Sequence, residues 1–292
     1  MARSRGVSGV VTAHRQTEGG GFVVRRPFPG EQLDMADPFL LLDEMGPVTY
    51  APGEALGAPD HPHRGFETVT YVLEGEMEHE DSAGHRGALG PGDVQWMTAG
   101  LGVVHSEMPS ARMQRDGGRM HGFQLWVNLP AREKMRAPRY QEFPAARLPK
   151  GAASDGLARV TVLAGEALGA RAVIETVTPI LYHDWTLAPG ARAEASVPES
   201  HDAFVYVFSG EARVGADGHD VGDGQLARLG PGDSVPLACA ADAAAPARLL
   251  LIGGVPLREK VARWGPFVMN TEAEIGQAIR DFQEGRLGEI RR

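Results

Sequence analysis

The sequence predicts an all-β protein made of two similar β-barrels, with one short α-helix near the C-terminus. Two strings of the first half return in the same order in the second half: residues 71–76 (YVLEGE) return as 206–211 (YVFSGE), and residues 89–93 (LGPGD) return as 229–233 (LGPGD). Short segments rich in β-branched and aromatic residues alternate with turns, for which the chain carries 38 Gly and 21 Pro. Ordered repeats at nearly equal spacing indicate two copies of one barrel.

The first half contains several expected strands separated by turns that carry Gly or Pro. The clearest is the segment 123–129, where apolar and polar side chains alternate as they do in a half-buried strand. The turn at 89–93 combines Pro, which fixes φ, with Gly, which adopts positive φ. The expected strands of this half are residues 7–11, 38–44, 68–73, 77–81, 94–97 and 123–129.

The two barrels are expected to meet in the segment 130–157, where four prolines are interspersed with Lys and Arg. We therefore expect an N-terminal metal-binding barrel over residues 1–135 and a C-terminal barrel over residues 136–292. Near the end, Thr271 and Glu274 form a capping-box pattern, and apolar residues then recur at helical spacing up to Gly285. This amphipathic helix is expected to pack against a barrel.

Composition excludes several classes of function. The net charge of −9 and the absence of clustered Lys and Arg argue against direct binding to nucleic acid. The single cysteine, Cys239, excludes an intrachain disulfide and fits a reducing compartment. The N-terminus has no apolar signal segment, and the longest apolar run, residues 249–252, is far shorter than the roughly 20 residues of a membrane span. We expect a cytoplasmic protein that does not cross a membrane.

Four residues of the first half form a candidate metal site. His61 and His63 are two residues apart, as are His105 and Glu107, so on β-strands each pair lies on one face. Three imidazoles and one carboxylate suit Fe, Mn, Ni, Cu or Zn, and on a six-coordinate ion they leave two positions for water, substrate or dioxygen. Each pair alone is a weak signal, because such pairs are common on protein surfaces. No ligand role is expected for the three other histidines of this half, His79, His85 and His121.

The second half serves as an internal comparison. Shifted by the spacing of the repeats, the four candidate ligands correspond to Ser196, Pro198, Ala245 and Ala247, which cannot replace them. The second barrel is therefore expected to lack the metal site, and its nearby His201 is interpreted as structural. This separation indicates that the four residues of the first half are not required by the barrel itself.

Several motifs resemble the pirin family of the cupin superfamily. These motifs are residues 34–39 (DMADPF), 61–68 (HPHRGFET), 92–100 (GDVQWMTAG), 105–109 (HSEMP) and 265–271 (GPFVMNT), and the resemblance covers nearly the whole chain. It implies a bicupin with a single iron, Fe(II) or Fe(III), in the N-terminal barrel. By that resemblance His61, His63, His105 and Glu107 are the iron ligands.

Two functions follow from the resemblance. The first is a dioxygenase that cleaves a flavonol such as quercetin with O2, like a quercetin 2,3-dioxygenase, in which Glu107 could serve as the general base for the flavonol hydroxyl. The second is a redox-sensitive iron-binding regulator that binds a protein partner, either a transcription factor or a metabolic enzyme. The sequence assigns no substrate-binding residue, because the lining of a pocket cannot be read from strand patterns alone.

Overall fold

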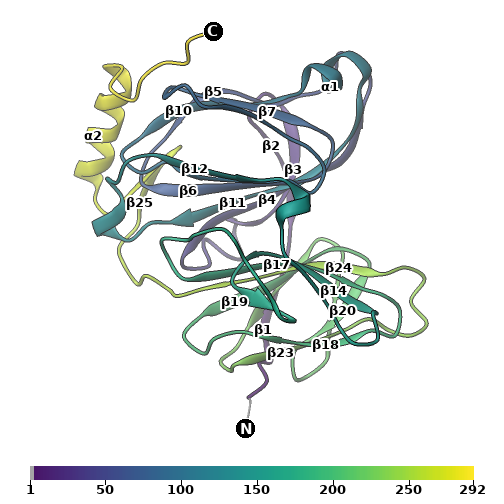
Figure 1. Cartoon of the computed structure of the whole chain (residues 1–292). Helices are drawn as coiled ribbons and strands as arrows, with labels where there is room; N and C mark the ends of the chain where they lie inside the picture. The colour runs from purple at the N-terminus through teal and green to yellow at the C-terminus, as the bar shows by residue number, and fades with distance from the viewer. Residues whose placement is uncertain (1–2) are drawn as a thin grey trace. The chain divides into compact units, whose positions relative to one another are not determined.

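The structure is a computed structural model that describes residues 3–292, and it is dominated by β-strands (Figure 1). In this range the strands form two seven-stranded sheets, two four-stranded sheets and two short two-stranded ribbons. One seven-stranded and one four-stranded sheet make up each barrel. The all-β fold class with two cupin-type barrels and a short C-terminal helix is thus confirmed.

The first barrel pairs a seven-stranded sheet, in the order β12-β9-β6-β11-β4-β3-β2, with a four-stranded sheet, in the order β5-β10-β7-β8. Every pairing in the two sheets for which a register is defined is antiparallel. The bounds of these strands are β2 His14–Glu18, β3 Phe22–Phe28, β4 Phe39–Tyr50, β5 Ala58–His63, β6 Phe66–Glu74, β7 Met77–Asp81, β8 Arg86–Leu89, β9 Val94–Thr98, β10 Val103–Pro109, β11 Gly118–Asn128 and β12 Arg139–Phe143.

The second barrel repeats this topology strand for strand. Its seven-stranded sheet has the order β1-β22-β19-β24-β17-β14-β13, and its four-stranded sheet has the order β18-β23-β20-β21. The bounds are β1 Val7–Thr12, β13 Lys150–Ala152, β14 Ala158–Ala164, β17 Ile180–Leu187, β18 Arg192–Ser196, β19 Asp202–Ser209, β20 Glu211–Val214, β21 His219–Gly222, β22 Gln225–Leu229, β23 Ser234–Ala238 and β24 Ala247–Gly254.

The terminal segments of the chain belong to the opposite halves. Residues 3–14 and 27–38 form a compact unit with residues 147–256, whereas residues 257–292 form one with residues 15–26 and 39–146. β1 occupies the edge next to β22 that β12 occupies next to β9 in the first barrel. The compact units therefore differ from the expected continuous ranges 1–135 and 136–292. Those ranges were expected from local sequence patterns, which do not reveal that a terminal segment pairs at the edge of a distant sheet.

Most expected strands occur, with different lengths. β4 and β11 extend well beyond the apolar segments that predicted them, and the expected connection at 130–157 contains β12, which pairs with β9. A short helix, α1 (Ala111–Asp116), was not expected; Ser110 caps it by accepting a hydrogen bond from the Met113 amide. The predicted C-terminal helix is α2 (Glu272–Gln283), with the capping box of Thr271 and Glu274 in place.

The remaining elements are two β-ribbons and two short 3₁₀ turns. β15 (Glu166–Ala167) pairs with β16 (Ala170–Arg171), and β25 (Ala262–Trp264) pairs with β26 (Phe267–Met269). The 3₁₀ turns, η1 (Ala131–Glu133) and η2 (Ala145–Arg147), flank β12. β25, β26 and α2 pack through an apolar cluster that also includes Val104 of β10.

The interior of the second barrel is apolar where the first barrel carries the candidate ligands. His61 lies opposite His105, and Glu107 lies opposite His79 on β7. The repeat of residues 71–76 aligns His79 with Val214, whose partner is Leu237 on β23. The same register, followed along β23 and β18, identifies the residues of the second barrel that occupy the ligand positions. Ala195 and Val197 correspond to His61 and His63, and Val235 and Leu237 correspond to His105 and Glu107. All four are buried in the apolar core.

This comparison corrects the four positions expected from the sequence. The LGPGD turn precedes β9 in the first barrel but follows β22, the counterpart of β9, in the second. The second string is therefore displaced by one strand, which moves Ala245 into a loop and Ala247 to the start of β24. Ser196 is off by one residue, which in a strand reverses the face. The second barrel still lacks the ligand set, because apolar side chains occupy the positions that correspond to the four candidate ligands.

Candidate metal centre

Three of the four predicted ligands converge inside the first barrel. β5 and β10 are antiparallel neighbours, with His61 directly opposite His105 and His63 opposite Val103. The imidazole centroids are 4.3 Å apart for His61 and His105, 4.7 Å for His61 and His63, and 4.9 Å for His63 and His105. One nitrogen from each ring lies within 4.8 Å of the other two, a spacing at which a single ion can contact all three.

The local sequence explains why His61 and His63 face inward together. The side chains of a strand alternate between its two faces, so the residues between and beside the histidines face outward. After His63 the chain turns at Gly65, where φ is +90° and an added Cβ would lie 1.9 Å from the Val268 carbonyl oxygen. Only glycine fits this turn, which carries the chain directly from β5 into β6.

Burial keeps two of these imidazoles neutral. His63 and His105 are 3% and 1% exposed. Desolvation holds the pKa of both well below the usual value, and the neighbouring histidines lower it further. A neutral imidazole keeps one ring nitrogen with a lone pair, which is the form that binds a metal ion. His63 and His105 can therefore coordinate a cation without first losing a proton.

The ring nitrogens show where a metal ion fits. Nδ1 of His63 and both nitrogens of His105 are buried, and none has a hydrogen-bond partner among the described residues. A buried polar atom left unsatisfied costs about 1–3 kcal/mol, so three in one cluster need compensation. Nδ1 of His61 lies 2.7 Å from the Pro59 carbonyl oxygen, to which it must donate, so Nε2 carries the lone pair. The donor set fits a metal ion.

Glu107 lies near the three histidines but outside their cluster. It lines the same cavity and is 8% exposed, while its Oε1 accepts a 2.6 Å hydrogen bond from Oγ1 of Thr70 on β6. The ladder between β5 and β10 is irregular here: His61 pairs with His105, but the next pair is Ala58 with Glu107. The extra residue lies in β5, so Glu107 has no histidine directly opposite it on that strand. Its role as a fourth ligand stays a prediction.

A second polar group, not anticipated from the sequence, lies beside the histidines. His79 and Asp81 on β7 pair directly with Glu107 and His105 on β10 and are each 3% exposed. The His79 Nε2 is 2.7 Å from the Glu142 carboxylate, and its ring stacks on Tyr140 with centroids 5.9 Å apart. The alternation of His79 and Asp81 was a signal that could have revealed this group.

Of the two other histidines assigned no ligand role, His85 is half exposed and lies 2.9 Å from Asp81, and His121 is buried 2.8 Å from Glu44. Neither joins the three-histidine cluster.

A cavity of about 510 Å³ opens from the histidines and is mostly apolar. Its size is in the range of small-molecule sites, roughly 300–1,000 Å³. His61, His63 and Glu107 supply polar groups at one end, together with Gln124. Large apolar side chains dominate the rest; they include Phe22, Val23, Met45, Leu56, Met77 and Met120. An apolar ligand with a few polar atoms matches this distribution.

Two cationic side chains in the cavity wall are fixed in place. Arg26 pairs with Asp43 through two hydrogen bonds of 2.6 and 2.5 Å. Arg263 lies over the Trp126 ring with its guanidinium carbon 4.9 Å from the centroid. The Trp126 ring in turn contacts the His63 ring at 5.2 Å. The wall next to the histidines therefore combines an aromatic surface with a positive charge.

No helix among the described residues is long and apolar enough to cross a membrane.

Comparisons with known proteins identify both halves of the chain. Residues 21–127 match the Pirin family model, and residues 182–288 match the model of the Pirin C-terminal cupin domain. A Pirin-like protein of Solanum lycopersicum is 46% identical over 99% of this chain and 94% of its own length. Pirin of Homo sapiens is 45% identical over 99% of this chain and 96% of its own. The crystal structure of a quercetin 2,3-dioxygenase from Acinetobacter baumannii is 38% identical, has a TM-score of 0.92, and matches 99% of this chain and 100% of that one.

Proposed function

The chain belongs to the pirin family, and we propose that it is a metal-dependent dioxygenase that cleaves a flavonol such as quercetin with O2. The single observation that carries this proposal is the position of the three-histidine cluster at one end of a mostly apolar cavity of about 510 Å³. The likeness to the quercetin 2,3-dioxygenase of Acinetobacter baumannii supports the same reaction class.

His61, His63 and His105 would hold one metal ion, with Glu107 as the fourth ligand. Iron is the metal we propose, although the donor set also accepts Mn, Ni, Cu or Zn. A metal ion bound there would supply Lewis-acid and redox chemistry toward the flavonol and O2. The Pro59 carbonyl orients the His61 ring by accepting a hydrogen bond from Nδ1. A partner of this kind fixes the tautomer of a ligand histidine.

Glu107 is the residue that we propose as the general base. Its carboxylate faces the cavity, where the flavonol 3-hydroxyl would have to lie to reach the metal site. Thr70 donates to Oε1 and restricts the rotation of the carboxylate, which orients it toward an incoming hydroxyl. Removing the hydroxyl proton makes the substrate oxygen a better metal ligand and activates the ring toward oxidation.

The remaining wall would bind the body of the substrate. A flavonol is planar, and the Trp126 ring beside His63 offers a flat surface close to the metal site. Arg263, whose guanidinium carbon lies 4.9 Å from the centroid of the Trp126 ring, places a positive charge near the end of the cavity where the deprotonated substrate would lie. The apolar side chains farther out would exclude water from the bound ring system.

Oxygen uptake by the metal-loaded protein tests this proposal. Protein loaded with each of Fe, Mn, Ni, Cu and Zn would be mixed with a panel of flavonols in an oxygen electrode, and its metal content measured on the same sample. We expect uptake that depends on both the metal and the flavonol, and its loss in His61→Ala. Protein with a full complement of metal that consumes no oxygen with any flavonol would overturn the dioxygenase and favour the redox-sensitive regulator.

A further inference from the structure

The strands that carry the three histidines are held on their outer side by the end of the chain. β5, with two of the histidines, is the edge strand of its sheet and has β10 as its only neighbour within it. Because side chains alternate along a strand, the residues next to each proposed ligand project from the opposite face of the strand, although Asp60 also lines the cavity. Those outward residues contact the segment 281–292, called here the C-terminal clamp.

We propose that the C-terminal clamp fixes the spacing of the metal ligands, and that Asp281 and Arg292 are positioning residues for the metal. This inference rests on the metal site of the proposed function. It assigns a role to a helix whose amphipathic pattern alone indicates no more than packing.

The first contact of the clamp fixes the C-terminal end of β5. Arg64, which follows His63, donates from Nη1 to Oδ2 of Asp281 at 2.6 Å and from Nε to the Leu101 carbonyl at 2.6 Å. The side chains of Arg64 and Asp281 are 5% and 13% exposed, so water competes little for this pair. The pair joins the strand of His63, the loop before β10 and the last turn of α2.

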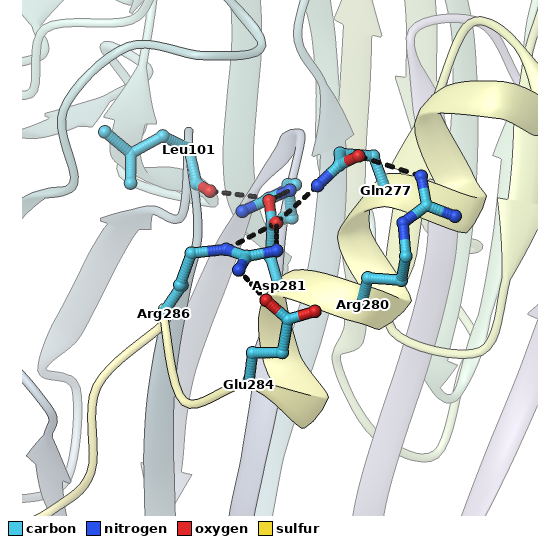
Figure 2. A network of polar contacts seen from close by, with 7 residues as sticks. Leu101, Gln277, Arg280, Asp281, Glu284 and Arg286 are labelled. Carbon is cyan, nitrogen blue, oxygen red and sulfur yellow. Dashed lines mark hydrogen bonds and ion pairs between the residues drawn. The ribbon is translucent and has the colours of Figure 1, made fainter.

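The Asp281 carboxylate is itself held by neighbours in its own segment. Gln277 donates to Oδ1 at 2.6 Å and Arg286 donates to it from Nε at 2.8 Å, as Figure 2 shows. These donors, with Arg64 as the first cause, lower the pKa of Asp281 far below its usual range. Asp281 therefore stays charged, and its orientation toward Arg64 is set by several bonds at once.

The second contact supports β10 beside His105. Oγ of Ser82 donates to the Leu287 carbonyl at 2.7 Å and accepts from the Val104 amide at 3.2 Å. Val104 and Leu287 also share an apolar cluster with Ile275 and Ala278 of α2. The clamp thus covers the outer face of the strand whose inner face carries His105.

The third contact fixes the other end of β5. Arg292 donates from Nη2 to Oδ1 of Asp60 at 2.6 Å, and from Nε to Oε2 of Glu80 on β7 at 3.2 Å. Its Nη2 also lies 3.5 Å from Oγ of Ser106, the residue between His105 and Glu107. Asp60 directly precedes His61. The clamp therefore reaches a sequence neighbour of each of the four proposed ligands.

Geometry explains why such support matters for metal binding. Metal affinity depends on ligand positions, and residues that only orient the ligands typically change it by 10–100-fold. β5 has a strand partner on one side, and beyond its C-terminal end the Arg64 backbone is also bonded to Pro266 and Val268. Movement of β5 away from β10 would carry His61 and His63 away from His105. Contacts at Asp60 and Arg64, on either side of the two histidines, oppose that movement.

The test measures how fast metal leaves the full-length protein. Asp281→Asn and Arg292→Gln would be compared with two control variants that remove the same charges far from the clamp: Asp220→Asn and Arg213→Gln, which break an exposed ion pair of the second barrel. Iron-loaded protein is mixed with excess chelator and release is followed by absorbance. We expect release about tenfold faster in both clamp variants and unchanged in both controls.

Two further measurements separate positioning from general stability. The melting temperature of the metal-free protein would be recorded for every variant; Arg292 is 56% exposed, so Arg292→Gln is expected to fold normally. In a double-mutant cycle, Arg64→Gln with Asp281→Asn should accelerate metal release by less than the product of the two single effects, because both variants remove the bond between Arg64 and Asp281. Wild-type rates in both clamp variants would overturn the inference. Wild-type protein that retains no metal would instead overturn the proposed metal site.

Discussion

His61 and His105 lie directly opposite each other on the antiparallel strands β5 and β10, with ring centroids 4.3 Å apart. The strands are far apart in sequence, yet the pairing places both imidazoles on the inner face of the barrel. The metal-binding hypothesis follows from this relationship, because His63 joins the pair from the same strand and two of the three rings have buried nitrogens without hydrogen-bond partners.

Removing one imidazole of the pair should abolish metal binding. We expect His105→Ala to reduce the metal content from about one ion per chain to nearly none, since it removes one of the three imidazoles that converge in the cluster. Elemental analysis of purified protein measures the ratio. His85→Ala is the matched control, because the His85 side chain is half exposed and lies outside the cluster. Equal metal content in the two variants would contradict the assignment.

Glu107→Gln tests the proposed base. The amide keeps the size of the side chain and still accepts a hydrogen bond from Thr70, but it cannot take a proton. We expect kcat on quercetin to fall about 10²-fold or more, while KM changes little. Steady-state oxygen uptake at several flavonol concentrations gives both constants. A kcat close to wild type in metal-loaded Glu107→Gln would assign the proton transfer to another group.

The turn after His63 should not tolerate a side chain. Gly65→Ala places a Cβ against the Val268 carbonyl, whereas Gly84, with the same φ of +90°, has no atom within 4 Å of an added Cβ. Both variants bear the cost of positive φ, so their difference isolates the clash. We expect Gly65→Ala to lower the free energy of unfolding by roughly 2 kcal/mol more than Gly84→Ala in urea titrations. Equal losses would show that the turn can relax.

Lys134 should make stability depend on alkaline pH. Its Nζ donates to the carbonyls of Gly65 and Val268 and to the Asn128 side chain, and burial lowers its pKa from 10.5 to about 8. Between pH 8 and 10.5 the unfolded chain therefore binds more protons than the folded one. The free energy of unfolding therefore increases with pH in this window. The stability contributed by Lys134 is fully present above pH 10.5, decreases as the pH falls, and is lost below pH 8.

We therefore expect the unfolding free energy of the wild type, relative to Lys134→Met, to rise by up to about 1.4 kcal/mol per pH unit across this window. Urea unfolding of both proteins from pH 7.5 to 10.5 measures it, and using the difference removes the contribution of groups that titrate alike in the two. A parallel pH dependence in the two proteins would show that the carbonyl acceptors keep the ammonium charged in the folded state.

The sequence predicted the fold class, and that His61 and His63 share one face of a strand, because both depend on local rules. Alternation along a strand fixes which face His61 and His63 share, and repeated strings reveal a duplicated barrel. Glu107 shows the limit of that rule: one extra residue in β5 interrupts the ladder, so Glu107 pairs with Ala58, and its carboxylate is not part of the three-histidine cluster. Irregular pairing of this kind depends on the partner strand, which spacing alone does not specify.

Long-range pairing explains what the sequence could not show. Nothing in residues 7–11 indicates that they pair with β22, and Arg64 and Asp281 are 217 positions apart. The second barrel gives another example. There the repeated LGPGD string lies in a turn one strand further along, so aligning the two strings predicted the wrong counterparts of the ligands. The strand pairing instead places Val235 and Leu237 at two of those positions, within an apolar core.

The most direct test is an anomalous difference map from a crystal of the iron-loaded protein, collected at the iron edge. The account predicts one peak at bonding distance, about 2.0–2.2 Å, from a nitrogen of His61, His63 and His105, with a Glu107 oxygen completing the protein ligands. A peak at another place, or contacts to fewer than the three histidines, would contradict the proposed metal site.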